Sequence, residues 1–464
     1  VSISLSSNSV KLLRNKKSYI KNVTKKLHSM MYGNVNPISF IVILLGSLSS
    51  ISVLASANLS SDTISKVVEP IFEPNKALAI QRVEQYDAEI EKLEENSVDG
   101  AFKTDIELLE NEKKRYQEVN GLPMLSILGG PAYTPEQGLL VAIGGLYSFK
   151  TDRTQQQLQR SSVSAFFVSN YVNDDIAYGL QAKHDLYWNN NDLSSSGEFS
   201  IGIGQSKHYW GTGYTAAQNT EMGDDTLYSA DSMEYTGDLF KRVHDEWYVG
   251  ALLNARYFDV IDAPLTGEYD EEYQKHKDAD FIFGIGIAVK YDTRDVAVNA
   301  RSGSLFNTEL YSYSESIGSD LSYQKLKVDY RTYYDFDEGN VIAFLANYQQ
   351  AYGDVPYFDM PEIGGPFSMR GLYQGRYRDK LAIEATTEYR YTFRNSSNLL
   401  SPHGMTVWAG IGSVAQDFNQ LTDAPVYSYG VGYRYELQPR MNLRLDLGMS
   451  QHGMGFYFNF TEAF

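Results

Sequence analysis

The sequence predicts an all-β protein, a 16-stranded antiparallel transmembrane β-barrel with a short N-terminal helical hairpin. From Leu122 onward, apolar and polar residues alternate in segments of about ten residues, as barrel strands between lipid and a watery lumen require. Aromatic residues are abundant, with 36 Tyr and 22 Phe, although mean hydropathy is only −0.35. No apolar run of helical length follows residue 57, which argues against a helical membrane span there. A soluble sandwich would alternate too, but it would seldom expose so many aromatic residues.

Composition excludes several classes of function. The net charge is −18 and the pI about 4.9, whereas a nucleic-acid binder needs a basic face. The chain has no cysteine, which excludes disulfides and thiolate metal sites. No phosphate-binding loop or metal-ligand spacing is present. We therefore expect no metal, cofactor or nucleic-acid partner.

Residues 1–57 have the pattern of a signal peptide. Seven basic residues open the chain: Lys11, Arg14, Lys16, Lys17, Lys21, Lys25 and Lys26. An apolar run from Ile38 to Leu54 follows, and then Ala55-Ser56-Ala57, a small-x-small cleavage site. The pattern predicts export and a mature start near Asn58. A retained membrane anchor is the alternative.

Residues 58–120 predict a periplasmic helical segment. Apolar residues recur at a spacing of four and three: Ala79, Val83, Tyr86, Ile90 and Leu93. A turn at 97–100 separates this run from a second one, so we expect a helical hairpin with charged outer faces. It would serve either as a docking or dimer-forming element or as a solvated spacer.

The alternation of apolar and polar residues across 121–464 predicts the barrel. In the segment 426–437, tyrosine and valine side chains face one way and Ser428, Gly430, Arg434 and Glu436 the other. Sixteen strand cores follow from such alternation: 124–133, 138–149, 161–172, 176–188, 197–207, 233–243, 245–257, 281–292, 302–314, 321–336, 340–352, 381–394, 405–416, 426–437, 440–449 and 453–464. An even number places both ends in the periplasm. The connections 208–232, 258–280 and 353–380 are then extracellular.

The connection 353–380 carries an unusual segment, GGPFSMRGLYQGRYRDK at 364–380. Gly364 and Gly365 break regular structure, and Arg370-Gly371-Leu372 lies among aromatic residues and further cations. Such a segment is either a solvated surface loop or a loop that folds inward and docks its arginine on a carboxylate.

Together with the following strand, this segment resembles the sixth extracellular loop of the outer-membrane assembly-factor superfamily, the BamA/TamA-type or bacterial surface antigen barrels. The resemblance implies that the loop folds into the lumen. In that family an acidic residue in a D-x-G pattern, on the strand after the docking strand, receives the arginine, but this sequence has Gly410 there. The candidate partners of Arg370 are other lumen carboxylates: Glu384, Glu388, Glu309 and Asp329.

Two further segments resemble the same family. The first is a periplasmic turn formed by Asp292, Arg294, Asp295 and Gly303, for which ordinary turn chemistry is the alternative. The second is the C-terminal assembly signal, for which an ordinary last strand is the alternative. Its phenylalanines are Phe456, Phe458, Phe460 and Phe464.

The resemblance implies a bacterial outer-membrane protein that aids protein or lipid insertion or transport. The helical segment does not match the β-containing POTRA modules of such proteins, so we expect a member without them. A passive porin-like channel and a loop-mediated surface antigen are the alternatives. Outer-membrane lipid, lipopolysaccharide and the barrel-assembly machinery are the implied partners, and no client is indicated. The histidines share no face and no G-x-S-x-G motif occurs, so we expect no enzyme.

Overall fold

The computed structural model describes residues 70–464, except 97–101, 135–137, 173–174 and 396–397. The predicted signal peptide, 1–57, lies outside the described residues, as does the segment 58–69. Among the described residues, no helix has both the length and the apolar character needed to span a bilayer.

The predicted helical hairpin is present as α3 (Lys76–Asn96) and α4 (Lys103–Val119). The helices pack through the rings of Tyr86 and Tyr116, whose centroids are 6.1 Å apart. The side chain of Arg153 donates to the carbonyl oxygens of Glu73, just before α3, at 2.7 Å and of Asn120, just after α4, at 3.0 Å. The apolar spacing thus identified a real helix pair, and the residues that flank it accept hydrogen bonds from the Arg153 side chain in the connection between β2 (Gly138–Phe149) and β3 (Ser161–Val172).

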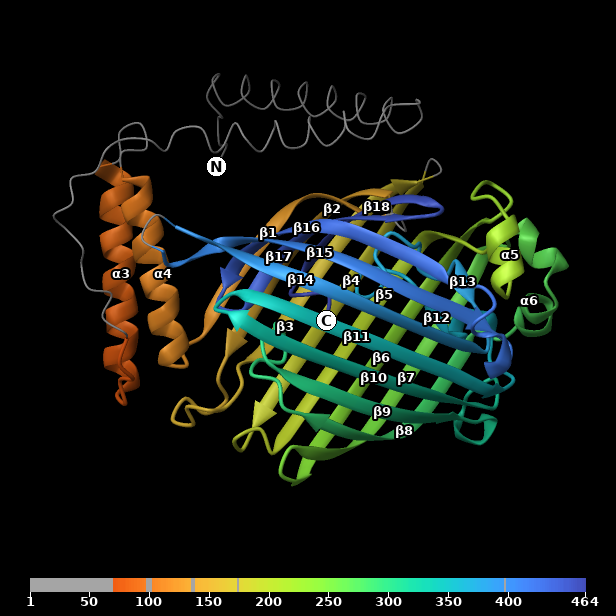
Figure 1. Ribbon diagram of the computed structural model, residues 1–464, viewed down its shortest axis with the longest axis horizontal. Helices are drawn as coiled ribbons and strands as arrows, with labels where there is room; N and C mark the ends of the chain where they lie inside the picture. Colours follow the sequence, from red (N-terminus) through yellow and green to blue (C-terminus); the bar gives the residue numbers. More distant parts are fainter. Residues whose placement is uncertain (1–69, 97–101, 135–137, 173–174, 396–397) are drawn as a thin grey trace, which may run out of the picture. The chain divides into compact units, whose positions relative to one another are not determined.

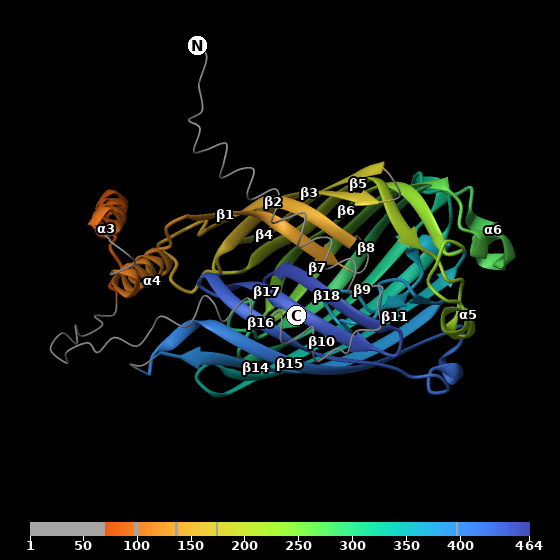
Figure 2. The same ribbon diagram turned by 90° about the horizontal axis from the view of Figure 1, so that it is seen from above.

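The described strands form one antiparallel sheet of 16 strands, in which each strand pairs with the next along the chain except that β11 pairs with β14. Its strands are β1 (Met124–Thr134), β2 (Gly138–Phe149), β3 (Ser161–Val172), β4 (Asp175–Trp188), β5 (Leu193–His208), β6 (Leu227–His244), β7 (Trp247–Asp262), β8 (Phe281–Asp292), β9 (Gly303–Tyr313), β10 (Tyr323–Asp337), β11 (Asn340–Gly353), β14 (Leu381–Arg394), β15 (Leu400–Ala415), β16 (Val426–Gln438), β17 (Met441–Ser450) and β18 (Gly453–Phe460). The sheet curves around an interior (Figures 1 and 2).

The long connections contain short elements that the sequence pattern did not predict. They are α5 (Tyr214–Asn219), η1 (Leu265–Tyr269), α6 (Glu271–His276), η2 (Glu315–Ile317), η3 (Tyr357–Asp359), η4 (Phe418–Gln420) and the strand pair β12 (Glu362–Ile363) and β13 (Tyr377–Arg378). Elements this short carry too few residues to show periodicity. Figure 1 places α5, α6 and the β12–β13 pair at the same end of the sheet.

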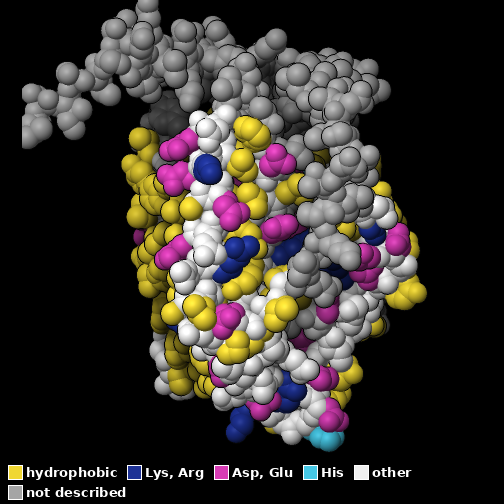
Figure 3. Space-filling view, turned by 90° about the vertical axis from the view of Figure 1, so that its left-hand side faces the viewer, with side chains coloured by type: hydrophobic (Ala, Val, Ile, Leu, Met, Phe, Trp, Pro, Cys, Tyr) yellow, Lys and Arg dark blue, Asp and Glu magenta, His cyan; other side chains and the backbone are white. Residues whose placement is uncertain are grey.

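Alternation along the strands separates an apolar outer face from a polar interior. On β2, Leu139, Val141 and Ile143 are 49%, 62% and 58% exposed, whereas Leu140, between the first two, is 4% exposed. On β14, Glu384 and Glu388 point inward and Ile383 and Tyr389 outward, as predicted. Figure 3 shows hydrophobic side chains gathered along the flank of the sheet, at the left edge of the view. Such an apolar band suits contact with lipid.

The two ends of the sheet, β1 and β18, approach each other, but no ladder of the described residues pairs them. Side chains bridge the gap instead. Gln438, at the end of β16, donates to Ser126 Oγ of β1 at 2.8 Å and accepts from Ser148 Oγ of β2 at 2.6 Å. Phe460 of β18 stacks on Phe166 of β3, with centroids 4.5 Å apart. We call this boundary between β1 and β18 the seam.

Candidate functional site: a loop docked in the barrel interior

The loop 354–380 folds inward. Four of its side chains, Ile363, Met369, Leu372 and Tyr377, are at most 1% exposed. They pack against side chains of β14, β15 and β16, namely Ala382, Val414 and Val426. Burying this much apolar surface stabilises the inward position. The solvated surface loop that the composition also allowed is therefore wrong.

Glycines allow the loop backbone to lie directly on the sheet. Gly371 has a φ of +105°, and a Cβ there would come within 2.5 Å of Met449 N. The opposing Gly448 leaves room for the carbonyl group of Arg370, because a Cβ on it would lie 2.5 Å from that oxygen. Gly371 N donates to Tyr457 Oη at 3.1 Å, and Ser450 Oγ donates to Gly371 O at 2.8 Å. The Arg-Gly step is thereby fixed against β17 and β18.

Arg370 is completely buried between two carboxylates from different strands. Its Nη2 donates to Glu388 of β14, and its Nη1 donates to Asp446 Oδ2 of β17 at 3.0 Å. The guanidinium lies over the indole of Trp408, with Cζ 3.8 Å from the ring centroid. Charge-assisted hydrogen bonds are stronger than neutral ones, and a desolvated cation–π contact is stronger than an exposed one. Arg370 therefore joins the loop to both β14 and β17.

Further arginines surround these carboxylates. Asp446 also accepts from Arg434 at 2.6 Å and from Arg444 at 2.9 Å, and Glu388 accepts from Arg390 at 2.7 Å. Arg444 in turn donates to Pro366 O of the loop at 2.7 Å. With Glu462, which Arg434 contacts at 2.8 Å, four arginines face three carboxylates. The network connects the loop with β14, β16 and β17.

Of the four candidate partners of Arg370, only Glu388 receives it. Glu384 does bind the loop, but through Ser368 Oγ at 2.8 Å and Gly364 N at 3.3 Å. Glu309 and Asp329 were wrong as partners, because each is engaged on its own strand. Glu309 accepts from Asn307 at 2.8 Å, and Asp329 accepts from Arg331 Nε at 2.9 Å.

Asp446 was missed although the sequence carried a signal for it. Asp446-Leu447-Gly448 is a D-x-G tripeptide, but it stands on β17 and not on the strand after the docking strand. Although β15 and β16 lie between β14 and β17 in the sheet, Arg370 contacts both strands from the interior, which strand order alone does not reveal. Gly410 has another use: a Cβ there would lie 3.2 Å from Met369 Cγ, so the glycine makes room for the loop.

The predicted turn between β8 and β9 is tied together by its charged residues. Arg294 donates to both oxygens of Asp292, at 2.9 and 2.7 Å, and Asp295 accepts from Arg301 N at 2.9 Å. Gly303 has a φ of +94°, and a Cβ on it would collide with Thr293 O. Asp295 also pairs with Arg440, so two turns at this end of the sheet are linked.

The C-terminal residues depart from the expected last strand. Phe456, Phe458 and Phe460 lie on β18, opposite leucines of β17, but the strand ends at Phe460 and not at 464. Thr461, with a φ of +64°, turns the chain inward. Phe464 is 5% exposed in a cluster with Tyr333 and Leu345, and its carbonyl accepts from Arg390 at 2.8 Å. That these phenylalanines act as an assembly signal stays a prediction.

The inward loop with its buried arginine, held inside an antiparallel sheet with an apolar outer band, defines an outer-membrane barrel with a docked loop. Residues 142–464 match the Omp85 superfamily domain, and the chain belongs to this superfamily. It is an outer-membrane β-barrel protein of bacteria, as the sequence resemblance predicted.

Solved structures with a similar fold include BamA from Haemophilus ducreyi lacking POTRA domains 1–3, at 14% identity and a TM-score of 0.44, covering 73% of this chain and 69% of that one. CdiB from Escherichia coli matches at 10% identity and a TM-score of 0.45, covering 76% and 69%. CdiB from Acinetobacter baumannii matches at 9% identity and a TM-score of 0.43, covering 76% and 68%. A comparison with curated proteins gave no significant match.

Proposed function

We propose that this protein is a 16-stranded barrel closed at the seam, and that it aids the insertion or transport of protein or lipid at the outer membrane. In this proposal the docked loop keeps the interior narrow, and the seam is the part that yields to a client. Outer-membrane lipid, lipopolysaccharide and, during biogenesis, the barrel-assembly machinery are its partners. No catalytic step is involved.

The observation that carries the proposal is the complete burial of Arg370 between Glu388 and Asp446. A buried charge is costly unless it is paired, so the two carboxylates that pair with Arg370 hold the loop in its docked position. That position occupies space which a passive pore would leave open to water. It also braces β17, next to the last strand of the sheet.

The seam supports the second half of the proposal. Separating two paired strands of the sheet breaks their backbone hydrogen bonds, which is costly in lipid. At the seam, by contrast, the described contacts are between side chains such as Gln438 and Ser126. On the β1 side the strand contains Gly129 and Gly130. Glycine weakens a strand. The seam is therefore the boundary that separates at least cost.

A passive channel is the second candidate, favoured by a cavity of about 740 Å³ in the interior. Its lining is rich in charged side chains from β4 to β10, among them Lys183, Asp185, Lys290 and Arg331. Such a lining suits water and small solutes. A high, steady conductance of the unmodified protein would favour this function over the first.

The test locks the seam. Because the chain has no cysteine, Ser126→Cys with Gln438→Cys introduces the only thiols, which a short reducible cross-linker can join. We expect proteoliposomes carrying the uncross-linked variant to accelerate the folding of an added, unfolded barrel protein. Cross-linking should abolish the acceleration and reduction should restore it. Each single-cysteine variant, treated in the same way, is the control. Acceleration that survives cross-linking, or is absent throughout, would refute the proposed role.

A further inference from the structure

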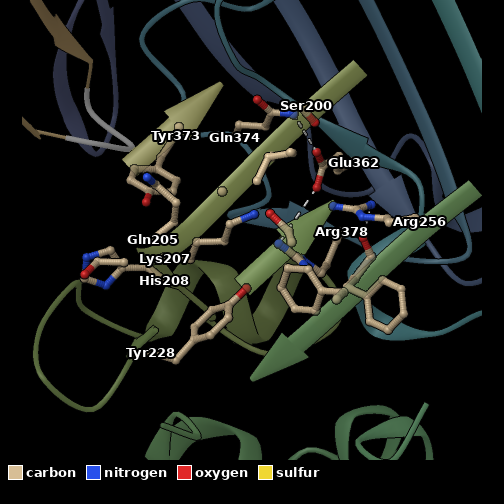
Figure 4. A pocket seen from close by; sticks show the side chains of 17 residues that line it. Ser200, Gln205, Lys207, His208, Tyr228, Arg256, Glu362, Tyr373, Gln374 and Arg378 are labelled. Carbon is tan, nitrogen blue, oxygen red and sulfur yellow. Dashed lines mark hydrogen bonds and ion pairs between the residues drawn. The ribbon is translucent and has the colours of Figure 1, made fainter. Parts of the chain in front are cut away.

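A second pocket lies between the docked loop and the inner faces of β4 to β7 (Figure 4). Its volume is about 280 Å³, close to the lower limit of about 300 Å³ for small-molecule sites. The strands supply Lys207, Arg256 and Tyr228, and the loop supplies Glu362 and Arg378 among others. The pocket is separate from the ion-pair network around Arg370 and is complete only when the loop is docked.

The charges that line this pocket do not balance. Three cations, Lys207, Arg256 and Arg378, face one carboxylate, Glu362. Arg256 donates to Phe358 O at 2.8 Å and lies 3.6 Å from Glu234 and 3.8 Å from Asp359, while Arg378 lies 3.8 Å from Glu362. Two of the three cations thus have carboxylates within ion-pair distance, and the positive charge that no described carboxylate pairs with is that of Lys207, which favours an anionic occupant.

Of the three lining cations, Lys207 is the one without a described polar partner. Arg378 donates to the carbonyls of Gly375 at 2.8 Å and Tyr357 at 2.9 Å, so its position is fixed by backbone. Within the described part of the chain, the Lys207 ammonium has neither a hydrogen bond nor an ion pair. The ammonium lies over the ring of Phe258, with Nζ 5.0 Å from the centroid. A lysine among other cations, with no described carboxylate at ion-pair distance, is suited to pair with an anion from outside.

The rest of the lining combines aromatic rings with neutral polar groups. The rings are Tyr228, Phe258, Phe358 and Tyr373, and the neutral polar side chains are Gln205, Gln374, Ser200, Ser206 and Ser232. Gln205 is fixed by donating to Tyr178 O at 2.7 Å. Flat apolar rings pack on the C–H face of a sugar, while amides and hydroxyls bond its hydroxyl groups. A few fixed polar groups among aromatic side chains are typical of a ligand site.

We propose that this pocket binds a single phosphorylated sugar. Lys207 pairs with the phosphate, and the aromatic and amide side chains hold the ring. The volume admits one sugar unit and excludes a chain. The same chemistry occurs in a free sugar phosphate and in the phosphorylated sugar headgroup of an outer-leaflet lipid, and the experiment distinguishes these two sources.

The experiment measures binding by calorimetry with the full chain refolded in detergent. The soluble ligands are N-acetylglucosamine 1-phosphate, neutral N-acetylglucosamine and inorganic phosphate. For the lipid source, the protein is titrated with vesicles of phosphatidylcholine with and without monophosphoryl lipid A. The variants are Lys207→Met, Lys207→Arg and, as a matched control, Lys327→Met. Lys327 also faces the interior and also has its ammonium near a ring, at 5.3 Å from the Tyr311 centroid.

We expect saturable binding of the sugar phosphate, at least tenfold tighter than that of the neutral sugar. Lys207→Met should weaken it at least tenfold, while Lys207→Arg and Lys327→Met should leave it within about twofold, because a charge at 207 is what matters. Binding only to vesicles with lipid A would assign the site to the lipid headgroup. Equal binding of the neutral sugar, an unchanged affinity in a correctly folded Lys207→Met, or no binding of either phosphorylated ligand would overturn the proposal.

Discussion

Replacing Arg370 by alanine removes the one side chain that joins the loop to both β14 and β17. Breaking a buried ion pair costs about 3–5 kcal/mol. Here Glu388 keeps Arg390 at 2.7 Å, and Asp446 keeps Arg434 at 2.6 Å and Arg444 at 2.9 Å. The abandoned carboxylates are thus still paired, which places the cost at the lower end, about 3 kcal/mol. Since about 1.4 kcal/mol corresponds to tenfold, the undocked loop should become roughly a hundredfold more populated.

Losing the Arg370 contacts should change the behaviour of the loop and leave the folding of the barrel unchanged. In planar bilayers Arg370→Ala should raise the conductance, because the undocked loop vacates the interior, and limited proteolysis should cleave within 354–380. The mobility shift on heating should persist, because the ladders of the sheet are untouched. Glu388→Gln should reproduce part of the effect.

Arg331→Ala is the matched control for Arg370→Ala. Arg331 is an interior arginine paired with Asp329 on its own strand, so its removal abandons a carboxylate without touching the loop. It should leave loop cleavage unchanged. If Arg370→Ala showed wild-type conductance and wild-type cleavage, the arginine would not hold the loop and the reasoning would fail.

Three other predictions follow from particular contacts. Gly448→Ala should free the loop to proteolysis as Arg370→Ala does, because its Cβ would collide with the Arg370 carbonyl; an unaffected loop would contradict the close approach. Deleting 76–119 should leave the heat-dependent mobility shift intact, because the sheet forms its ladders without the helices; loss of folding would show the hairpin to be structural. Burial, and then the charge of Arg376, lower the pKa of His452 to about 4. His452 contacts Tyr377 of the loop, and its folded pKa lies below the usual 6.5, so loop docking should weaken as pH falls from about 6.5 to 4. Loop cleavage by protease should therefore increase over this pH range, and His452→Gln should remove the increase. If the variant kept the same pH dependence, a group other than His452 would be responsible.

Much of the sheet was predictable because its signal is local. A strand that faces lipid on one side and the interior on the other must alternate, so each strand shows its pattern within about ten residues. Glu388 was predictable for the same reason, since alternation along β14 turned it inward. The helix pair was visible through its own 3.6-residue period.

The strands, their faces, the helices and the unusual composition of the loop around Arg370 could thus be read from the sequence. Which of the two loop positions is adopted became clear only from the folded chain, because that choice depends on groups far apart in the sequence. The tertiary structure made Asp446 the second partner, excluded Glu309 and Asp329, and turned the residues after Phe460 back into the interior. Curvature of the sheet sets these distances, and curvature arises from the packing of all the strands together. No single segment of the sequence records it.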